Sequence, residues 1–255
     1  MEDTQPVLQK VSEGALLPLD GDRAVSFIDG KFPYTFYFSR LTQADWQTYY
    51  EAVVYTTQNQ KESQITVLDM ENPGIDLVQQ KLIRVDGYRG DFTSKPGWQA
   101  KIMPRHLRPA AWLLRFVGPC EGFGEDRPFD PECIEIGLTA AWGITEPGKM
   151  SGYEGLVHRF APVTAEHRRK FYRASSESRV VGGSRNGKTI HALRHRLLFS
   201  FYDELILSVD GYKVKDRPLT DVTEIRNEMD GFHKVKAVEL LFAGASKSVD
   251  TAEAE

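Results

Sequence analysis

The sequence predicts an α+β protein made of two tandem copies of one small module, each with a β-hairpin or strands followed by about three helices. Three observations support this class: residues that recur at nearly constant spacing, a hydrophobic content of 41% that can fill a core, and a Gly- and Pro-rich stretch near the middle. The expected parts are an N-terminal extension, a first module, a linker, a second module and a flexible tail, spanning 1–24, 25–118, 119–132, 133–243 and 244–255.

The repeat consists of three blocks that recur in one order. The first has an offset of 122 (160 − 38) and matches Phe38, Leu41, Thr42, Tyr49, Tyr50 and Ala52 with Phe160, Val163, Thr164, Phe171, Tyr172 and Ala174. The second has an offset of 124 (206 − 82) and matches Leu82-Ile83 and Val85 to Tyr88 with Ile206-Leu207 and Val209 to Tyr212. The third has an offset of 127 (233 − 106) and matches His106, Ala110, Leu113 and Leu114 with His233, Ala237, Leu240 and Leu241. Offsets that only grow indicate a duplication with short insertions.

Strands open each module. Apolar residues alternate from Val25 to Phe38 around Asp29-Gly30, which predicts a hairpin with a tight turn. The second module has comparable apolar stretches at Ile134 to Trp142 and Leu156 to Phe160. We therefore expect a strand pair at the start of each copy.

Helices follow the strands. Thr42 and Thr164 stand where an N-cap belongs, before breaker-free stretches. We expect a second helix in each copy to end at Gly87 or Gly211, because glycine commonly follows a last helical turn. A third helix should run from Pro104 to a stop at Gly118, with a counterpart from about Phe232 to Phe242.

One motif resembles a nucleotide site. Gly182, Gly187, Lys188 and Thr189 match the P-loop pattern, in which amides, an ammonium group and a hydroxyl hold phosphates and Mg²⁺. The context argues against this function, because no buried strand precedes the glycines and only 66 residues follow Thr189 (255 − 189).

The same segment also has a simpler interpretation. Asn186-Gly187 is a strong tight-turn signal between Val180-Val181 and Ile190, and the aligned first-copy stretch Val53 to Ile65 has no glycine, as expected for a surface loop. We therefore expect a solvated loop and no cofactor, and we keep P-loop nucleotide binding as an alternative.

Positive charge is concentrated in residues 158–196, which hold ten Lys or Arg and two acidic residues in a chain of net charge −4. The residues expected to form one partner-binding surface are Arg168, Arg169, Lys170, Arg173, Arg185, Arg194 and Arg196. Such a surface suits an acidic face of another subunit or the phosphates of a nucleic acid. Because a pI of about 5.9 is unusual for a nucleic-acid binder, we favour protein contact and keep nucleic-acid binding as an alternative.

Histidine and cysteine patterns predict neither a metal site nor catalysis. His106 and His233 share one repeat position with no second His, Cys or positioned carboxylate nearby in sequence, so we expect a local hydrogen bond or helix-start contact. The pair His191/His195 lacks the Glu of the zinc-protease pattern, and His158 and His167 add no further ligand motif.

Cys120 and Cys133 are expected to be free thiols. No nucleophile with a partner or pair of carboxylates can be placed, so we expect a protein that is not an enzyme.

The sequence predicts a cytoplasmic location. Its first residues lack the basic start and apolar run of a signal peptide, and no stretch approaches the roughly 18 apolar residues of a membrane span. We therefore expect no membrane partner.

The duplicated pattern resembles accessory structural proteins of tailed bacteriophages, in particular tail or head-to-tail assembly components, including tail assembly chaperones. The residues that carry the resemblance are Phe38/Phe160, Thr42/Thr164, Val85–Tyr88/Val209–Tyr212 and His106/His233. The resemblance implies a non-catalytic protein that binds copies of itself or another component of the virion, in the host cytoplasm or the particle. Together with the charge asymmetry, it predicts a structural or assembly protein that acts through protein–protein contacts.

Overall fold

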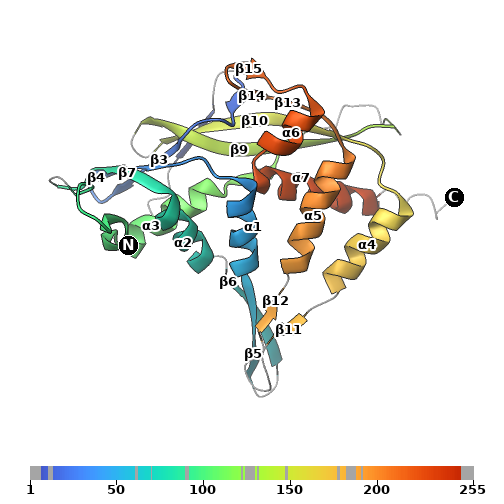
Figure 1. Ribbon diagram of the computed structural model, residues 1–255, viewed down its shortest axis with the longest axis horizontal. Coiled ribbons are helices and arrows are strands. Elements are labelled where there is room, and N and C mark those ends of the chain that lie inside the picture. The colour runs from blue at the N-terminus through green and yellow to red at the C-terminus, as the bar shows by residue number, and fades with distance from the viewer. Residues whose placement is uncertain are drawn as a thin grey trace.

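A computed structural model describes the chain at residues 7–10, 14–60, 63–69, 71–89, 92–121, 123, 130, 132–146, 149–176, 179–181, 188–190 and 192–247. It has the predicted α+β class, with the long strands across one side of the molecule and helices packed beneath them (Figure 1). Among the described residues, no helix is both long and apolar enough to cross a membrane.

The first half contains a hairpin, a helix, a second hairpin, a helix and a strand, followed by a short 3-10 helix and a final helix. These elements are β3 (Arg23–Asp29), β4 (Phe32–Phe38), α1 (Gln43–Ala52), β5 (Val54–Gln60), β6 (Ser63–Asp69), α2 (Glu71–Lys81), β7 (Leu82–Asp86), η1 (Trp98–Lys101) and α3 (Pro104–Leu114). The predicted hairpin around Asp29-Gly30 is confirmed, because β3 and β4 pair antiparallel and Gly30 adopts a positive φ of 64°.

The second half repeats this order as far as the strand after its second helix, and then has two short strands and a helix, in place of the 3-10 helix, before its final helix. Its elements are β9 (Ile134–Glu146), β10 (Lys149–Phe160), α4 (Ala165–Ser176), β11 (Arg179–Val181), β12 (Lys188–Ile190), α5 (Ala192–Leu205), β13 (Ile206–Asp210), β14 (Tyr212–Val214), β15 (Arg217–Pro218), α6 (Val222–Glu228) and α7 (Gly231–Lys247). Helix α7 covers the predicted 232–242 and extends to Lys247, so the first residues of the predicted tail are helical.

Strand register is also shared by the two halves. In the β4–β7 pair, Phe36 faces Val85, and a bulge then places Phe38 opposite Leu82. In the β10–β13 pair, the corresponding partners are His158 with Val209 and, after a bulge at the same place, Phe160 with Ile206. The shared order and register support the predicted duplication, which itself stays a prediction.

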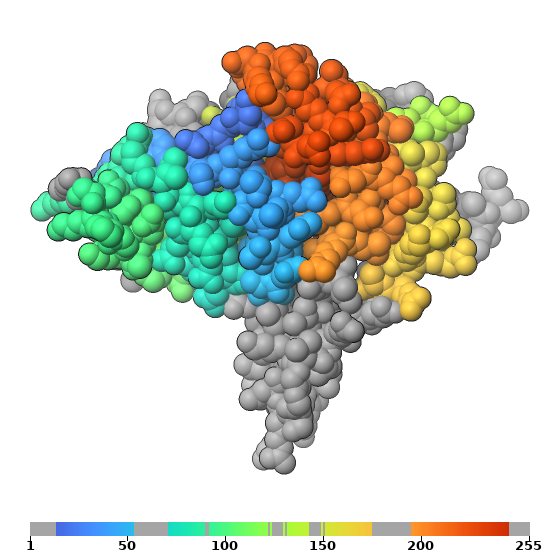
Figure 2. Space-filling view, in the orientation of Figure 1, coloured from blue at the N-terminus to red at the C-terminus, as the bar shows by residue number. Residues whose placement is uncertain are grey.

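Burial follows the same correspondence. Phe38 and Phe160, which share one repeat position, are both fully buried. Ile83 and Leu207, which share another, are both exposed, by 47% and 45%. One cluster of buried apolar side chains contains residues of both halves. On the face shown in Figure 2, the atoms of α1 lie against those of α5, so the two halves meet in a common core.

Three segments outside the repeated elements connect the halves. Strand β1 (Val7–Lys10) pairs with β10, β2 (Leu17–Pro18) pairs with β14, and β8 (Val117–Pro119) pairs with β9. The predicted extension 1–24 therefore contributes β1 and β2 to sheets of the second half, and β8, at the boundary between the predicted first module and linker, contributes a third strand.

Two expectations about glycines are wrong. The second helices end at Lys81 and Leu205, and Gly87 and Gly211 instead follow the strands β7 and β13. Both glycines have positive φ, 101° and 88°, and a Cβ on Gly87 would lie 2.3 Å from a backbone oxygen. The glycines are thus needed to turn the chain after a strand rather than after a helix. The expected stop of the third helix at Gly118 is also wrong, since α3 ends at Leu114.

The expectation of a surface loop at Val53 to Ile65 is wrong as well. This stretch forms most of the hairpin β5–β6, whose backbones pair from Val54 with Asp69 to Gln60 with Ser63. The many polar residues give this stretch the composition of a loop, but Thr and Tyr in β5 and Ile and Val in β6 have high strand propensity. The hairpin projects from the body of the molecule (Figure 1).

Helix capping gives a first test of the fold. Thr42 caps α1 as predicted: its Oγ1 accepts a hydrogen bond from Asp45 N at 3.3 Å, and Thr42 N donates to Asp45 Oδ2 at 2.8 Å. Thr42→Ala should lower the free energy of unfolding, measured by urea denaturation, by about 1 kcal/mol. Thr48→Ala is the matched control inside the same helix and should cost less, because Thr48 caps nothing and alanine favours helix. Equal losses would contradict the capping role.

Candidate functional site

The structure describes part of the predicted basic surface. Arg169, Lys170 and Arg173 are exposed on α4, which lies along the edge of the face shown in Figure 2, and Arg168 is half-buried. Lys170 pairs with Glu166 one turn earlier at 2.9 Å. Helix α4 therefore presents several cations on its exposed side, and Lys170 is paired there with Glu166.

The remaining basic residues divide between other locations. Arg196 lies on α5 and pairs with Glu51 of α1, and α1 and α4 flank α5 on opposite sides (Figure 1). Its guanidinium thus faces α1 rather than the surface of α4. Arg194 lies in the first turn of α5, and Arg185 lies outside the described residues. Among the basic residues whose side chains are described, Arg196 therefore lies apart from the cations of α4.

The P-loop-like segment has strand geometry where it is described. Lys188 and Thr189 lie in β12, which pairs antiparallel with both β11 and β5, and the next helix begins only at Ala192. In a P-loop the corresponding Lys and Thr open a helix after a parallel strand. Gly182 and Gly187 lie outside the described residues. The strand pairing around Lys188 is therefore unlike that of a phosphate-binding loop, and the predicted turn at Asn186-Gly187 lies outside the described residues.

His106 lies near the start of α3, but its hydrogen bonds are not the local ones that the sequence predicted. Its Nε2 lies 2.8 Å from Asp29 Oδ2, and its Nδ1 bonds the hydroxyl of Tyr88. The hydrogen bond from His106 lowers the pKa of Asp29, and burial raises the pKa of Tyr88 to about 12. Both imidazole nitrogens are occupied and the ring is buried, so this group is arranged to hold β3 against α3 rather than to accept a proton from a substrate.

The other histidines are dispersed. His158 is buried in β10, His167 lies at the start of α4 with its Nε2 3.1 Å from Glu204, and His195 stacks on Tyr50. His191 lies outside the described residues. In the described part of the chain, no three His, Cys, Asp or Glu side chains are grouped so that they could hold a metal ion.

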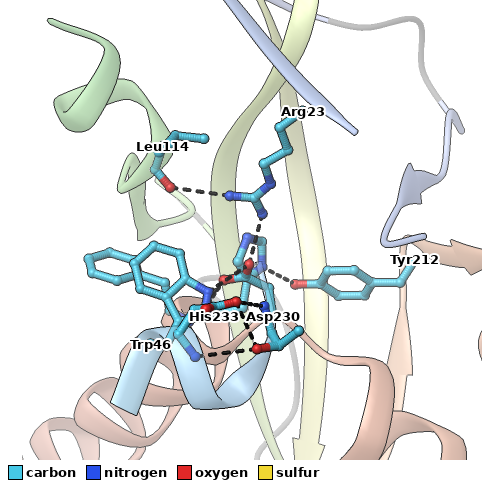
Figure 3. A network of polar contacts seen from close by, with 9 residues as sticks. Arg23, Trp46, Leu114, Tyr212, Asp230 and His233 are labelled. Carbon is cyan, nitrogen blue, oxygen red and sulfur yellow. Dashed lines mark hydrogen bonds and ion pairs between the residues drawn. The ribbon is translucent and has the colours of Figure 1, made fainter. Parts of the chain in front are cut away.

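A buried ion pair lies where the halves meet (Figure 3). Arg23 of the first half donates to Asp230 Oδ2 of the second at 3.0 Å, and both side chains are 4% exposed. Arg23 also donates to the carbonyl of Leu114 at 3.2 Å and stacks over the ring of Trp142. Burial lowers the pKa of Arg23 to about 10, so at neutral pH it still carries its charge.

Asp230 accepts hydrogen bonds from both halves. Trp46 Nε1 of the first half donates to its Oδ2 at 3.1 Å, and the amide of Phe232 donates to its Oδ1 at 2.9 Å, at the start of α7. Lys234 is a second buried cation that contacts both halves: its Nζ donates to Gln43 of α1 at 2.9 Å and to Asp203 of α5 at 2.8 Å. These contacts fix α1 to the second half of the chain.

From α7 the polar contacts continue through histidine and tyrosine side chains that alternate. His233 Nδ1 lies 2.9 Å from the hydroxyl of Tyr212, which lies 2.7 Å from His158 Nε2, and His158 Nδ1 lies 2.9 Å from the hydroxyl of Tyr202. Burial lowers the pKa of His233 to about 4 and that of His158 well below its usual value. Both rings are therefore neutral at pH 7. The Tyr212–His233 contact repeats the Tyr88–His106 contact of the first half.

The surface that sequence reasoning missed is the edge of a small sheet. The hairpins of the two halves form one sheet in the order β11-β12-β5-β6, in which Lys188 faces Thr56 and Thr189 faces Tyr55. In the part of the chain that the structure describes, no strand pairs with the outer edge of β6 or of β11. Free backbone edges of this kind can accept a strand from another chain.

Comparisons with known proteins add no relative: no protein-family model matches the chain, and neither curated proteins nor solved structures give a significant match.

Proposed function

We propose that the protein is a non-enzymatic structural or assembly component that acts through protein–protein contacts in a larger complex. Following the resemblance of its duplicated sequence, that complex would be a particle such as a tailed bacteriophage, and the partners would be further copies of the chain or other subunits of the particle.

The main support for this proposal is the projecting sheet. It stands away from the common core, and its two outer strands present backbone N–H and C=O groups that no described strand satisfies. The exposed cations of α4 offer a second, charged contact on a chain of net charge −4. The polar clusters of the interior support the proposal in another way, because the rings of His106, His158 and His233 are buried and hydrogen-bonded to tyrosine hydroxyls.

Self-association that depends on salt is the expected result. Light scattering and native mass spectrometry at low ionic strength should show species larger than the 28.9-kDa chain, and ~0.5 M NaCl should shift them towards the monomer. Replacing Arg169, Lys170 and Arg173 together by Glu should weaken the assembly. A monomer at all salt concentrations, also in the presence of proteins encoded by neighbouring genes, would contradict the proposal.

The control for this experiment changes the same charge at another place. Lys31, Lys95 and Lys101 are exposed on the first half, and their joint replacement by Glu alters the net charge equally. The control should assemble like the wild type if α4 provides the contact.

The same triple variant of α4 tests nucleic-acid binding, which the exposed positive face of α4 favours as a second candidate function. An affinity for a nucleic acid that falls steeply with salt and is lost in the α4 variant would support that function instead.

A further inference from the structure

The contact between the two hairpins within the chain has a counterpart that the chain cannot satisfy by itself. In both halves, the hairpin follows the first helix, so β11 corresponds to β5 and β12 corresponds to β6. Inside the chain, β12 of the second half pairs with β5 of the first. The equivalent contact, in which β6 would pair with a β11, is missing among the described strands, because these two strands lie at opposite edges of the sheet.

We propose that β6 of one copy pairs with β11 of a second copy, so that the sheet continues from chain to chain. This inference rests on the proposed function and names its partner, a further copy of the same chain. Its basis is continuity with an interface that already exists within the chain. Every neighbouring pair in this sheet is antiparallel, and adding β11 to β6 preserves the alternation.

The register of the new contact follows from the register of the existing one. The strand pair nearest the helices is Val54 with Asp69 in the first hairpin and Arg179 with Ile190 in the second. In the existing contact, Thr189 and Tyr55 each lie one residue from these ends, and the residues at the same places in β6 and β11 are Leu68 and Val180. Lys188 and Thr56 each lie two residues from the ends, and their counterparts are Val67 and Val181.

The next pair in this register joins Asp69 of one copy to Arg179 of the other. Opposite charges and apolar residues directly across an antiparallel pair are stabilising combinations. The transferred register thus places an acid opposite a base and Leu or Val opposite Val, although the residues at these positions played no part in choosing it. This agreement is an independent argument for the contact.

The sequence of β6 also fits a strand that is paired in the assembled state. Its residues Ser63 to Leu68 carry no charge and include no proline or glycine. Strands that remain at a free edge usually carry charges or proline that prevent pairing with other chains. Only Asp69, which the proposed register pairs with Arg179, interrupts this pattern.

The proposed contact joins two different surfaces, β6 and β11, so it is heterologous. Such a contact does not close on itself after two copies, and repeated addition gives a ring or a helical filament. A two-fold contact, by contrast, would place β6 of one copy against β6 of the other.

Cysteine cross-linking distinguishes these arrangements. Asp69→Cys and Arg179→Cys are introduced into a chain in which Cys120 and Cys133 are replaced by serine, and mild oxidation is followed by non-reducing electrophoresis. The double variant should give a ladder or a closed ring of linked chains. A mixture of the two single variants should give dimers only, and each single variant alone should give none. Within one chain, the two positions are three strand spacings apart, roughly 14 Å, which is beyond the reach of a disulfide.

Two controls make the result specific. Ser63→Cys lies at the far end of β6, roughly 20 Å from position 69, and should not link to Arg179→Cys. Asp69→Arg and Arg179→Asp should each weaken self-association roughly fivefold, and their combination should restore it, since the charges are exchanged.

The contrary outcomes are separable. Linking of Asp69→Cys alone would replace the proposed contact by a two-fold one. Assembly in light scattering without a link between positions 69 and 179 would overturn the inference and leave the proposed function standing. A monomer at every concentration, alone and with other particle components, would overturn both.

Discussion

Replacing Asp230 by alanine should lower the free energy of unfolding by about 3–5 kcal/mol, the largest effect we expect from a single substitution. The change leaves the guanidinium of Arg23 charged and buried with only the carbonyl of Leu114 as a described hydrogen-bond partner. It also removes the acceptor of Trp46 Nε1 and the side-chain cap of α7. Urea denaturation followed by Trp fluorescence measures the loss.

The comparison with other ion pairs makes this prediction specific. Glu224→Ala removes the partner of Arg217, an exposed pair on the second half, and should cost no more than about 1 kcal/mol. Replacing both members of the buried pair, by Arg23→Met with Asp230→Leu, should be less damaging than Asp230→Ala alone, because no charge is left buried without its counterion. If Asp230→Ala costs no more than Glu224→Ala, the ion pair does not hold the halves together.

Acidification from pH 6.5 to pH 4 should destabilise the fold by about 3 kcal/mol through His233. Burial lowers the pKa of His233 from 6.5 to about 4 in the folded chain, so below pH 6.5 the unfolded chain binds a proton that the folded chain does not. The stabilisation is thus complete above pH 6.5 and is lost as the pH falls towards 4. His158 shifts in the same direction and adds to the loss.

Urea denaturation at intervals between pH 7 and pH 4 measures this dependence. His233→Gln removes the titrating ring and should flatten the curve, even where it lowers stability at pH 7. The carboxyl of Asp29 has a pKa below its usual 3.8, so its contribution to stability is lost mainly as the pH falls below about 4, where most of the change from His233 has already occurred. A wild-type curve that stays flat down to pH 4 would contradict a neutral, buried His233.

The elements that have a clear local signal could be predicted from the sequence. Thr42 and Thr164 marked two helix starts, and the apolar alternation around Asp29-Gly30 marked a hairpin. The mistakes arose where one residue type serves two structures. Gly87 can end a helix or turn the chain after a strand, and the short strand Leu82–Asp86 has the apolar content of a buried helical turn.

Contacts between residues far apart in the sequence could not be predicted. Arg23 and Asp230 are separated by 207 residues, and His106 and Asp29 by 77, so no local pattern links them. The edges of β6 and β11 were missed for another reason. An unpaired edge is a property of backbone groups, which are the same for nearly every residue, and only the assembled sheet reveals which strand lies outermost.

The strands β1 and β2 have a consequence for biosynthesis. Val7 pairs with Lys149 and Leu17 with Tyr212, residues that follow them by 142 (149 − 7) and 195 (212 − 17) positions. At translation rates of about 5–20 residues per second, Leu17 is synthesised roughly 10 to 40 s before its partner. The nascent amino-terminal segment must therefore wait without its neighbours, and the sheets can be completed only when nearly the whole polypeptide has emerged.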